Sequence, residues 1–186
     1  MRRRIDPVFL IFLVLMLFTS LRRYSSPAEW FIQTILIIPG VVIGLSFHEF
    51  AHGWVAWKLG DPTPKFQGRV TVNPKAHIDP IGFVALLFAG FGWGQPVEIN
   101  PNNFKHRRRD ELLVSLAGVV MNLIVAVVFA LIVKLLFMVT GVDFLTGDFG
   151  NILWTILYYV IYINLVLMIF NLIPVPPLDG FSIISE

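Results

Sequence analysis

The chain has 186 residues, of which 56% are hydrophobic and only 14% are charged. Globular domains carry about a quarter of charged residues, so this composition excludes an ordinary soluble domain and predicts an integral membrane protein. The net charge of +2 is small, and the cations stand in short clusters beside apolar segments, which favours a role in topology over nucleic-acid binding.

Five hydrophobic segments follow one another along the chain. Four of them are expected to span the bilayer as helices, which requires about 20 apolar residues each. The first follows three arginines but lacks the small-residue cleavage site of a signal peptide, so we expect an uncleaved helix. The third is short and rich in glycine, so we expect it to be re-entrant, with a full span left open. The segments cover residues 7–21, 29–57, 81–93, 112–139 and 152–173.

Two stretches between these segments contain helix-breaking residues. Prolines interrupt residues 61–74, within which residues 66–72 have the composition of a short strand. Residues 95–103 form another predicted loop, with two prolines and three asparagines. The predicted fold is therefore an α-helical integral membrane protein with about four transmembrane helices plus a re-entrant or short β element. Residues 1–186 are interpreted as a single membrane-embedded domain with no appended soluble domain.

The distribution of charge predicts the orientation of the chain in the membrane. Cations occupy residues 2–4 and 105–109, whereas the loop that contains Asp143 and Asp148 has none. Under the positive-inside rule, the two basic clusters face the cytoplasm and the acidic loop faces outward. We therefore expect a multi-pass protein of the cell membrane with a cytoplasmic N-terminus. Arg22 and Arg23 would then lie outside, against the rule.

The sequence H-E-F-A-H at residues 48–52 lies at the end of an uncharged apolar run. His48 and His52 are four residues apart, so both rings lie on one face of a helix and can reach one zinc ion. Glu49 is then placed to act as a general base. Ionisable residues at membrane depth are costly without partners and usually mark a functional site. The alternative is a buried polar helix face whose groups are satisfied by neighbouring helices.

A catalytic zinc site needs a third protein ligand and an open position for water. The chain has no cysteine, so the ligand must be His, Asp, Glu or Asn. The best candidate is Asp179, in the proline-interrupted sequence N-L-I-P-V-P-P-L-D-G at residues 171–180. Irregular backbone at membrane depth is tolerated where it lines a buried cavity, which suits a metal site. A plain helix end with a solvated turn explains this spacing equally well.

Several motifs together resemble the site-2 protease family of intramembrane zinc metalloproteases. H-E-F-A-H and N-x-x-P-x-P-P-L-D-G lie on separate hydrophobic segments in the order of the family. Between them, residues 115–122 resemble the third element of the family, in which a glycine precedes an asparagine by four residues. Residues 73–82 and 92–101 are similar to the compact bacterial and archaeal branch. The resemblance extends from about residue 40 to residue 182.

The resemblance implies that His48, His52 and Asp179 bind one zinc ion per chain and that Glu49 is the catalytic base. It also implies that Asn122 contributes to catalysis by polarising or positioning the substrate, a membrane-bound protein cleaved in or near its transmembrane segment. The lipid bilayer is the expected surrounding, nucleic acid is not an expected partner, and the oligomeric state is left open.

The sequence departs from the family pattern in two places. Val119 stands where proline is frequent in this branch, and the chain ends at Glu186, where relatives usually continue, so the C-terminus is interpreted as possibly truncated. Two other functions therefore stay open: a membrane protein that binds or transports metal, and a catalytically inactive member of the same fold. The role of His77, which precedes the third hydrophobic segment, is also left open.

Overall fold

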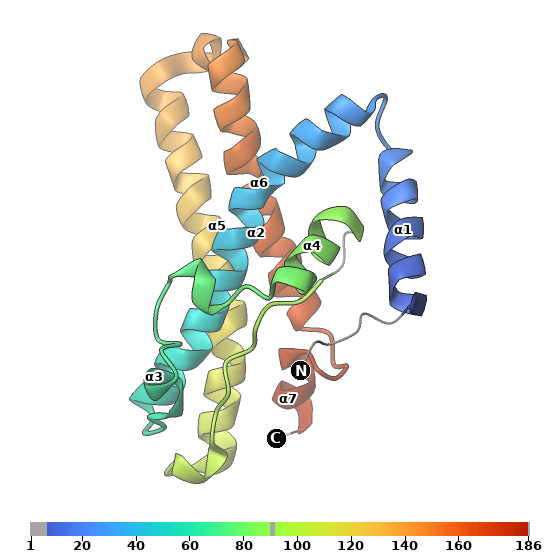
Figure 1. The fold of residues 1–186 in the computed structure, drawn as a ribbon. Coiled ribbons are helices and arrows are strands. Elements are labelled where there is room, and N and C mark those ends of the chain that lie inside the picture. Colours follow the sequence, from blue (N-terminus) through green and yellow to red (C-terminus); the bar gives the residue numbers. More distant parts are fainter. Residues whose placement is uncertain (1–6, 90–91, 186) are drawn as a thin grey trace.

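The computed structural model describes residues 7–89 and 92–185, and its regular elements there are all helices (Figure 1). Five of the seven α-helices are at least ten residues long. The α-helices are α1 (Pro7–Leu21), α2 (Pro27–Lys58), α3 (Thr63–Phe66), α4 (Pro80–Ala89), α5 (Arg107–Thr146), α6 (Asp148–Asn171) and α7 (Asp179–Ser185). Two short 3₁₀ helices, η1 (Pro74–Ala76) and η2 (Pro101–Asn103), interrupt the connections.

Three of these helices, α2, α5 and α6, are long and apolar enough to cross a membrane. The prediction of an α-helical membrane protein is therefore confirmed at this level. The count of four spans is not confirmed, because α1 has 15 residues and extends about 22 Å, against about 30 Å of hydrocarbon. The first, second and fourth predicted segments lie within α1, α2 and α5, whereas the third and fifth continue four and two residues beyond the ends of α4 and α6.

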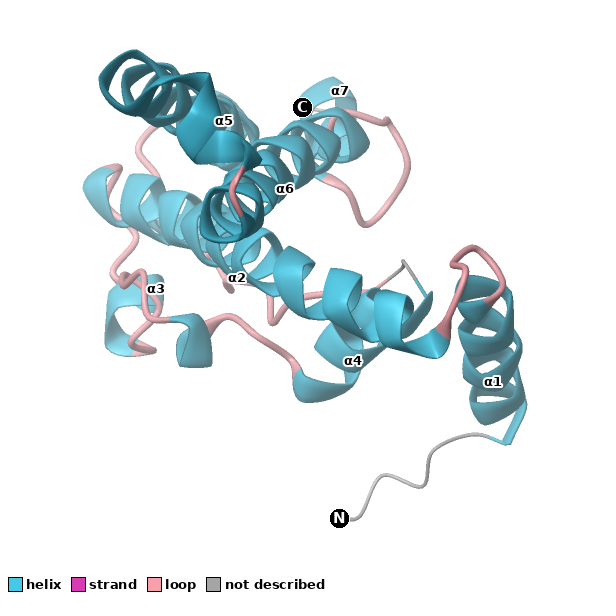
Figure 2. Ribbon diagram, turned by 90° about the horizontal axis from the view of Figure 1, so that it is seen from above, coloured by secondary structure: helices cyan, strands magenta, loops and turns pink. Residues whose placement is uncertain are grey.

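The three long helices pack against one another and form the centre of the fold (Figures 1 and 2). Gly40 and Gly44 lie one turn apart on the face of α2 that meets α6. A Cβ at position 40 would lie 2.7 Å from the Tyr159 carbonyl oxygen, and one at position 44 would lie 2.7 Å from Leu167 Cδ1. These two glycines therefore allow the close helix approach that small residues provide in membranes.

The third hydrophobic segment forms the short helix α4, about 15 Å long, followed by residues without regular structure. The chain enters α4 from the end of the bundle that holds α3, and it returns to that end before α5 begins (Figure 1). This path supports re-entry into the bilayer, which the sequence favours over a full span and which stays a prediction. Residues 90 and 91, in this predicted segment, lie outside the described residues.

The strand predicted for residues 66–72 is absent: Phe66 ends α3, and residues 67–72 have no regular secondary structure. Proline explains the difference, since Pro64 stands in the first turn of α3, where its fixed φ favours a helix and its missing N–H costs nothing. The alternating apolar residues that follow Phe66 do not form a strand, because no strand among the described residues is present to pair with them.

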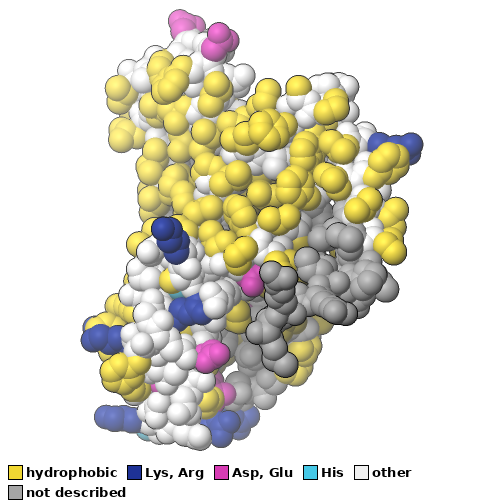
Figure 3. All heavy atoms as spheres, in the orientation of Figure 1, with side chains coloured by type: hydrophobic (Ala, Val, Ile, Leu, Met, Phe, Trp, Pro, Cys, Tyr) yellow, Lys and Arg dark blue, Asp and Glu magenta, His cyan; other side chains and the backbone are white. Residues whose placement is uncertain are grey.

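Charge separates along the long axis of the molecule (Figure 3). Acidic side chains mark the end where α5 meets α6, and most of the visible Lys and Arg side chains lie toward the opposite end. A broad hydrophobic surface lies between them. Exposed apolar side chains of the long helices include Leu131, Leu135 and Ile169. Such a surface suits contact with lipid, since exposed apolar patches of this extent are rare on soluble monomers.

Candidate metal centre

The two histidines of H-E-F-A-H lie on the buried face of α2, in its second half. His48 and His52 are 6% and 8% exposed, and their Nε2 atoms are 3.0 Å apart. The rings meet nearly edge to face, with an interplanar angle of 81°. The i, i+4 spacing therefore brings the two nitrogens to one point, as the sequence predicts.

Asp179 reaches the same point from the other end of the chain. It is the first residue of α7, and its Oδ2 lies 3.2 Å from His48 Nε2 and 3.3 Å from His52 Nε2. The adjacent Gly180 is buried where a Cβ would collide with the Leu172 carbonyl oxygen, so a glycine lets α7 return against the end of α6. The solvated-turn alternative for Asp179 is therefore wrong: the residue is partly buried and faces the histidine pair.

The hydrogen bond of His52 determines which of its nitrogens is available to a metal. His52 Nδ1 lies 2.7 Å from the Val114 carbonyl oxygen of α5, an atom that only accepts. Nδ1 must therefore carry the proton, which leaves a lone pair on Nε2 in the neutral ring. This is the arrangement that metal-ligating histidines commonly adopt.

The three converging atoms fit a tetrahedral zinc ion. Bonds of 2.0–2.1 Å at tetrahedral angles separate two ligand atoms by about 3.4 Å. The three separations here are 3.0, 3.2 and 3.3 Å. Asp179 Oδ2 is buried and has no hydrogen-bond donor among the described residues. The two histidine nitrogens and the carboxylate oxygen each offer an electron pair to the same point. A cation at that point would accept all three pairs.

Gly118 allows α5 to approach the histidines closely. A Cβ there would collide with His52 Nε2 and lie 2.6 Å from His48 Cε1. One turn later on α5, the fully buried Asn122 places its side-chain Nδ2 3.3 Å from His48 Nδ1. The sequence predicts this approach of Gly118 and Asn122 to the site, and both residues are there.

The amide of Asn122 has two possible orientations with respect to His48. Its Oδ1 is buried without a partner as drawn, whereas turning the amide by 180° would place Oδ1 next to Nδ1. The oxygen and nitrogen of an amide are assigned from the surrounding hydrogen bonds. If His48 offers Nε2 to a metal, its Nδ1 carries the proton, and an oxygen is the atom that accepts it.

Glu49 lies beside the histidines and is held by a loop. Its Oε2 accepts a 2.9 Å hydrogen bond from the backbone N–H of Val97. No residue in the part of the chain that the structure describes engages Oε1, so one oxygen of the carboxylate stays available. The sequence predicts Glu49 as a base, but no sequence signal pairs it with Val97, which is 48 residues away.

Two further polar residues singled out from the sequence stay away from the three converging atoms. His77 is fully buried, and its Nε2 lies 2.7 Å from the Thr71 carbonyl oxygen, so it holds its own loop. Asn171 donates from Nδ2 to the Leu167 carbonyl oxygen of its own helix at 2.9 Å. Neither belongs to the His48–His52–Asp179 group.

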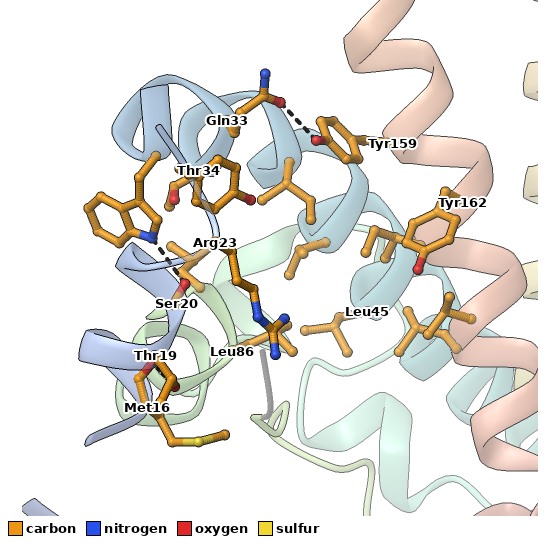
Figure 4. A pocket seen from close by; sticks show the side chains of 18 residues that line it. Met16, Thr19, Ser20, Arg23, Gln33, Thr34, Leu45, Leu86, Tyr159 and Tyr162 are labelled. Atoms are coloured by element: carbon orange, nitrogen blue, oxygen red, sulfur yellow. Dashed lines mark hydrogen bonds between the residues drawn. The ribbon is translucent and has the colours of Figure 1, made fainter. Parts of the chain in front are cut away.

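A cavity of about 430 Å³ lies beside α2, between α1, α4 and α6 (Figure 4). Arg23 extends into it, and a 2.8 Å hydrogen bond from Tyr159 Oη to Gln33 Oε1 lies at its border. Leu45, also in its wall, precedes His48 by less than one helical turn. The cavity therefore lies next to the metal centre along α2, although the three candidate ligands are not part of its wall.

Comparison with known proteins relates the chain to zinc metalloproteases. Residues 147–186 match the model of peptidase family M50. The chain is 45% identical over 147 residues to YwhC of Bacillus subtilis, which is named as a candidate zinc metalloprotease. It is 28% identical over 152 residues to Rip2 of Mycobacterium tuberculosis and 29% identical over 155 residues to Rip2 of Mycolicibacterium smegmatis, proteins with names of the same kind. No solved structure matches the chain.

The matched region covers most of this chain but only part of its relatives. It includes 78% of this chain and 66% of YwhC, and 80% of this chain and 55% of Rip2. The aligned length is sufficient to identify the family, and it confirms the resemblance that the sequence motifs indicate. The chain belongs to peptidase family M50, the site-2 protease family.

Proposed function

We propose that this chain is the membrane-embedded core of an intramembrane zinc metalloprotease, which hydrolyses peptide bonds in or near the transmembrane segments of membrane-bound proteins. One observation carries the proposal: His48, His52 and Asp179 converge within 3.3 Å of one another, beside Glu49, in a bundle of apolar helices. The names of the relatives support zinc as the metal, with one ion per chain.

Each residue of the centre has a chemical role in this proposal. Zinc, when bound, polarises a carbonyl group and lowers the pKa of water from about 15.7 to about 7. Glu49 accepts a proton from the attacking water through its free oxygen and delivers it to the leaving amine. The bond from the Val97 N–H restrains the carboxylate in one orientation. Burial of the centre keeps bulk water away from these groups.

The substrate in this proposal is an extended segment of a membrane protein. The carbonyl groups of a transmembrane helix are engaged in i to i−4 hydrogen bonds, so the helix must unwind locally before attack. The irregular backbone of residues 92–100 beside Glu49 supports binding of such a segment by strand addition, because backbone groups outside helices can pair with a peptide.

A metal transporter is the second candidate, and the surroundings of the centre do not favour it. A permeation pathway needs further intramembrane ligands and a polar route to both faces. Within residues 7–89 and 92–185, the only group of three or more His, Asp or Glu side chains that converge on one point is this one. The described residues in the wall of the neighbouring cavity include no His, Asp or Glu side chain that could serve as a further ligand.

Zinc binding is expected to depend on Asp179. Asp179→Ala removes one of three protein ligands, so the purified variant should contain far less than one zinc per chain while its helix content stays unchanged. Asp148→Ala, which changes an exposed carboxylate at the start of α6, should retain wild-type zinc. Metal analysis and circular dichroism measure both, and full zinc in the Asp179 variant would remove this residue from the ligand set.

Cleavage is expected to require Glu49 although zinc binding does not. Glu49→Gln preserves the shape of the side chain and can still accept from the Val97 N–H, but its amide cannot accept a proton at neutral pH. The variant should bind one zinc and leave a transmembrane substrate uncleaved over the time in which the wild type completes the reaction. Turnover near that of the wild type would exclude Glu49 as the base.

Asn122 is proposed to contribute to catalysis, and its contact with His48 suggests how. If the amide oxygen accepts from His48 Nδ1–H, Asn122→Ala should lower zinc affinity or turnover by about 10–100-fold. Asn122→Asp retains an acceptor and should restore most of the loss. If the amide instead donates to the substrate, aspartate cannot replace it, and Asn122→Ala would reduce turnover with unchanged zinc affinity. Titration with zinc and initial rates on the three proteins distinguish the two roles.

The start of α5 is proposed to face the cytoplasm, and the turn between α5 and α6 to face outward. The charge separation along the molecule supports this orientation (Figure 3). The chain has no cysteine, so single cysteines can be labelled without background. In intact cells, an impermeant reagent should label Asp148→Cys and spare His106→Cys, both at exposed positions. The reverse pattern would overturn the orientation.

A further inference from the structure

The loop between α4 and α5 is fixed at three points by acceptors that come from three separate parts of the chain. The Gln95 N–H donates to the His77 carbonyl oxygen at 2.7 Å, and the Val97 N–H donates to Glu49 Oε2 at 2.9 Å. The Asn100 N–H donates to Asp61 Oδ2 at 2.7 Å. The middle contact is the one that holds the proposed catalytic base.

The carboxylate of Asp61 accepts four hydrogen bonds. It is fully buried, just after α2 ends, and its Oδ1 accepts from the Thr63 N–H, from Thr63 Oγ1 and from Asn103 Nδ2. Burial by itself raises the pKa of the Asp61 carboxyl, but the hydrogen bonds from Thr63, Asn100 and Asn103 outweigh it and hold that pKa below its ordinary value. Asp61 is therefore a charged acceptor at neutral pH.

The bond to Asn100 determines the register of the loop against α2. Asn100 follows Val97 by three positions, and a slip of one residue along extended backbone moves an N–H by about 3.3 Å. Such a slip takes the Val97 N–H out of hydrogen-bonding range of Glu49. The loop lies close to α2 here, since a Cβ at Gly53, one turn after Glu49, would be in ordinary van der Waals contact with Val97 Cγ1 at 3.6 Å.

We propose that Asp61 is a positioning residue for the reaction: it anchors the backbone of Asn100, and through that anchor it keeps the Val97 N–H on the carboxylate of Glu49. Asp61 touches neither the metal centre nor Glu49, and it acts through residues 97–100. This inference rests on the proposed function, because it assigns Asp61 a part in orienting the proposed base.

A purely structural role is the alternative. Phe104 is buried in a cluster with Ala56 and Val114, and Ile99 packs against that cluster. These contacts already attach the loop to α2 and α5, so Asp61 would then stabilise the fold alone. The two roles differ in one respect. Only in the positioning role do Asp61 and the Val97 N–H act on turnover through one chain of contacts, so that the loss of both lowers turnover no further than the loss of the Val97 N–H alone.

The variant Asp61→Asn tests the contact with minimal disturbance. An amide can accept through only one of its two terminal atoms. Keeping its oxygen at the Oδ1 position preserves the three bonds from Thr63 and Asn103 and directs an NH₂ group at the Asn100 N–H. The variant therefore loses the one bond that fixes the register, while the shape of the side chain stays the same.

Val97→Pro removes the N–H donor itself, and a variant of Gln67 serves as the control. Gln67→Ala removes a 2.8 Å hydrogen bond from Gln67 to the side chain of Glu98, which tethers the same loop at an exposed position. Each protein is tested as the full chain, loaded with zinc, on a transmembrane substrate.

We expect Asp61→Asn and Val97→Pro each to lower kcat by about 10–100-fold with unchanged KM and unchanged zinc content. The double variant should be no slower than Val97→Pro alone, because both changes break one chain of contacts. Gln67→Ala should stay within about threefold of the wild type. The inference would be overturned if the two reductions in kcat multiplied in the double variant, or if Asp61→Asn had the kcat of the wild type.

Hydrogen exchange gives a readout that does not depend on activity. The amides of residues 95–100 should exchange faster in Asp61→Asn than in the wild type, and Gln67→Ala should leave them unchanged. If the wild type cleaves no substrate but this difference appears, the proposed function fails and the anchor on Val97 is supported. If the wild type cleaves and Asp61→Asn neither exchanges faster nor turns over more slowly, the positioning role alone fails.

Discussion

The close approach of α5 to α2 at Gly118 is the constraint on which the candidate metal centre depends. A side chain at this position would occupy the space of the His52 and His48 rings. The same approach brings the Val114 carbonyl oxygen to His52 Nδ1 and the Asn122 amide to His48 Nδ1. A single small residue therefore allows one helix to orient both rings that a second helix carries. Helix packing in membranes uses small residues in this way, but here the contact also fixes chemistry.

The polar groups at this contact explain why a cation suits the centre. A buried acceptor without a donor costs about 1–3 kcal/mol, and an unpaired charge costs more. Asp179 Oδ2 has no donor, and the proton on His52 Nδ1 leaves its Nε2 as an acceptor too. A divalent cation compensates all three electron-pair donors together, whereas protonation of one histidine satisfies only part of the set. Gly180 completes the arrangement by letting Asp179 approach across the end of α6.

The parts of this structure that sequence predicts are those with local periodicity or a motif. Helical spacing brings His48 beside His52, and the four-residue spacing of Gly118 and Asn122 puts both on the face that meets them. The loops are harder to predict, because a strand at residues 66–72 depends on a partner that the fold does not supply. The bond between Val97 and Glu49 joins residues 48 positions apart through a backbone N–H. Every residue except proline carries this group, so the sequence does not indicate which one donates. For Asp61, likewise, the sequence indicates only a loop that prolines interrupt.

The proposed metal ligands and the proposed base are held by different kinds of structure. Two of the ligands lie on α2 where α5 packs against it at Gly118, and they are oriented by α5. The base is also on α2, but its carboxylate is oriented by a loop that polar contacts attach at His77 and Asp61. Loop contacts of this kind open at lower free-energy cost than a packed helix interface. The proposed ligands can therefore stay in place while the loop moves, and an entering peptide that displaces the Val97 N–H would change the orientation of the proposed base without disturbing them.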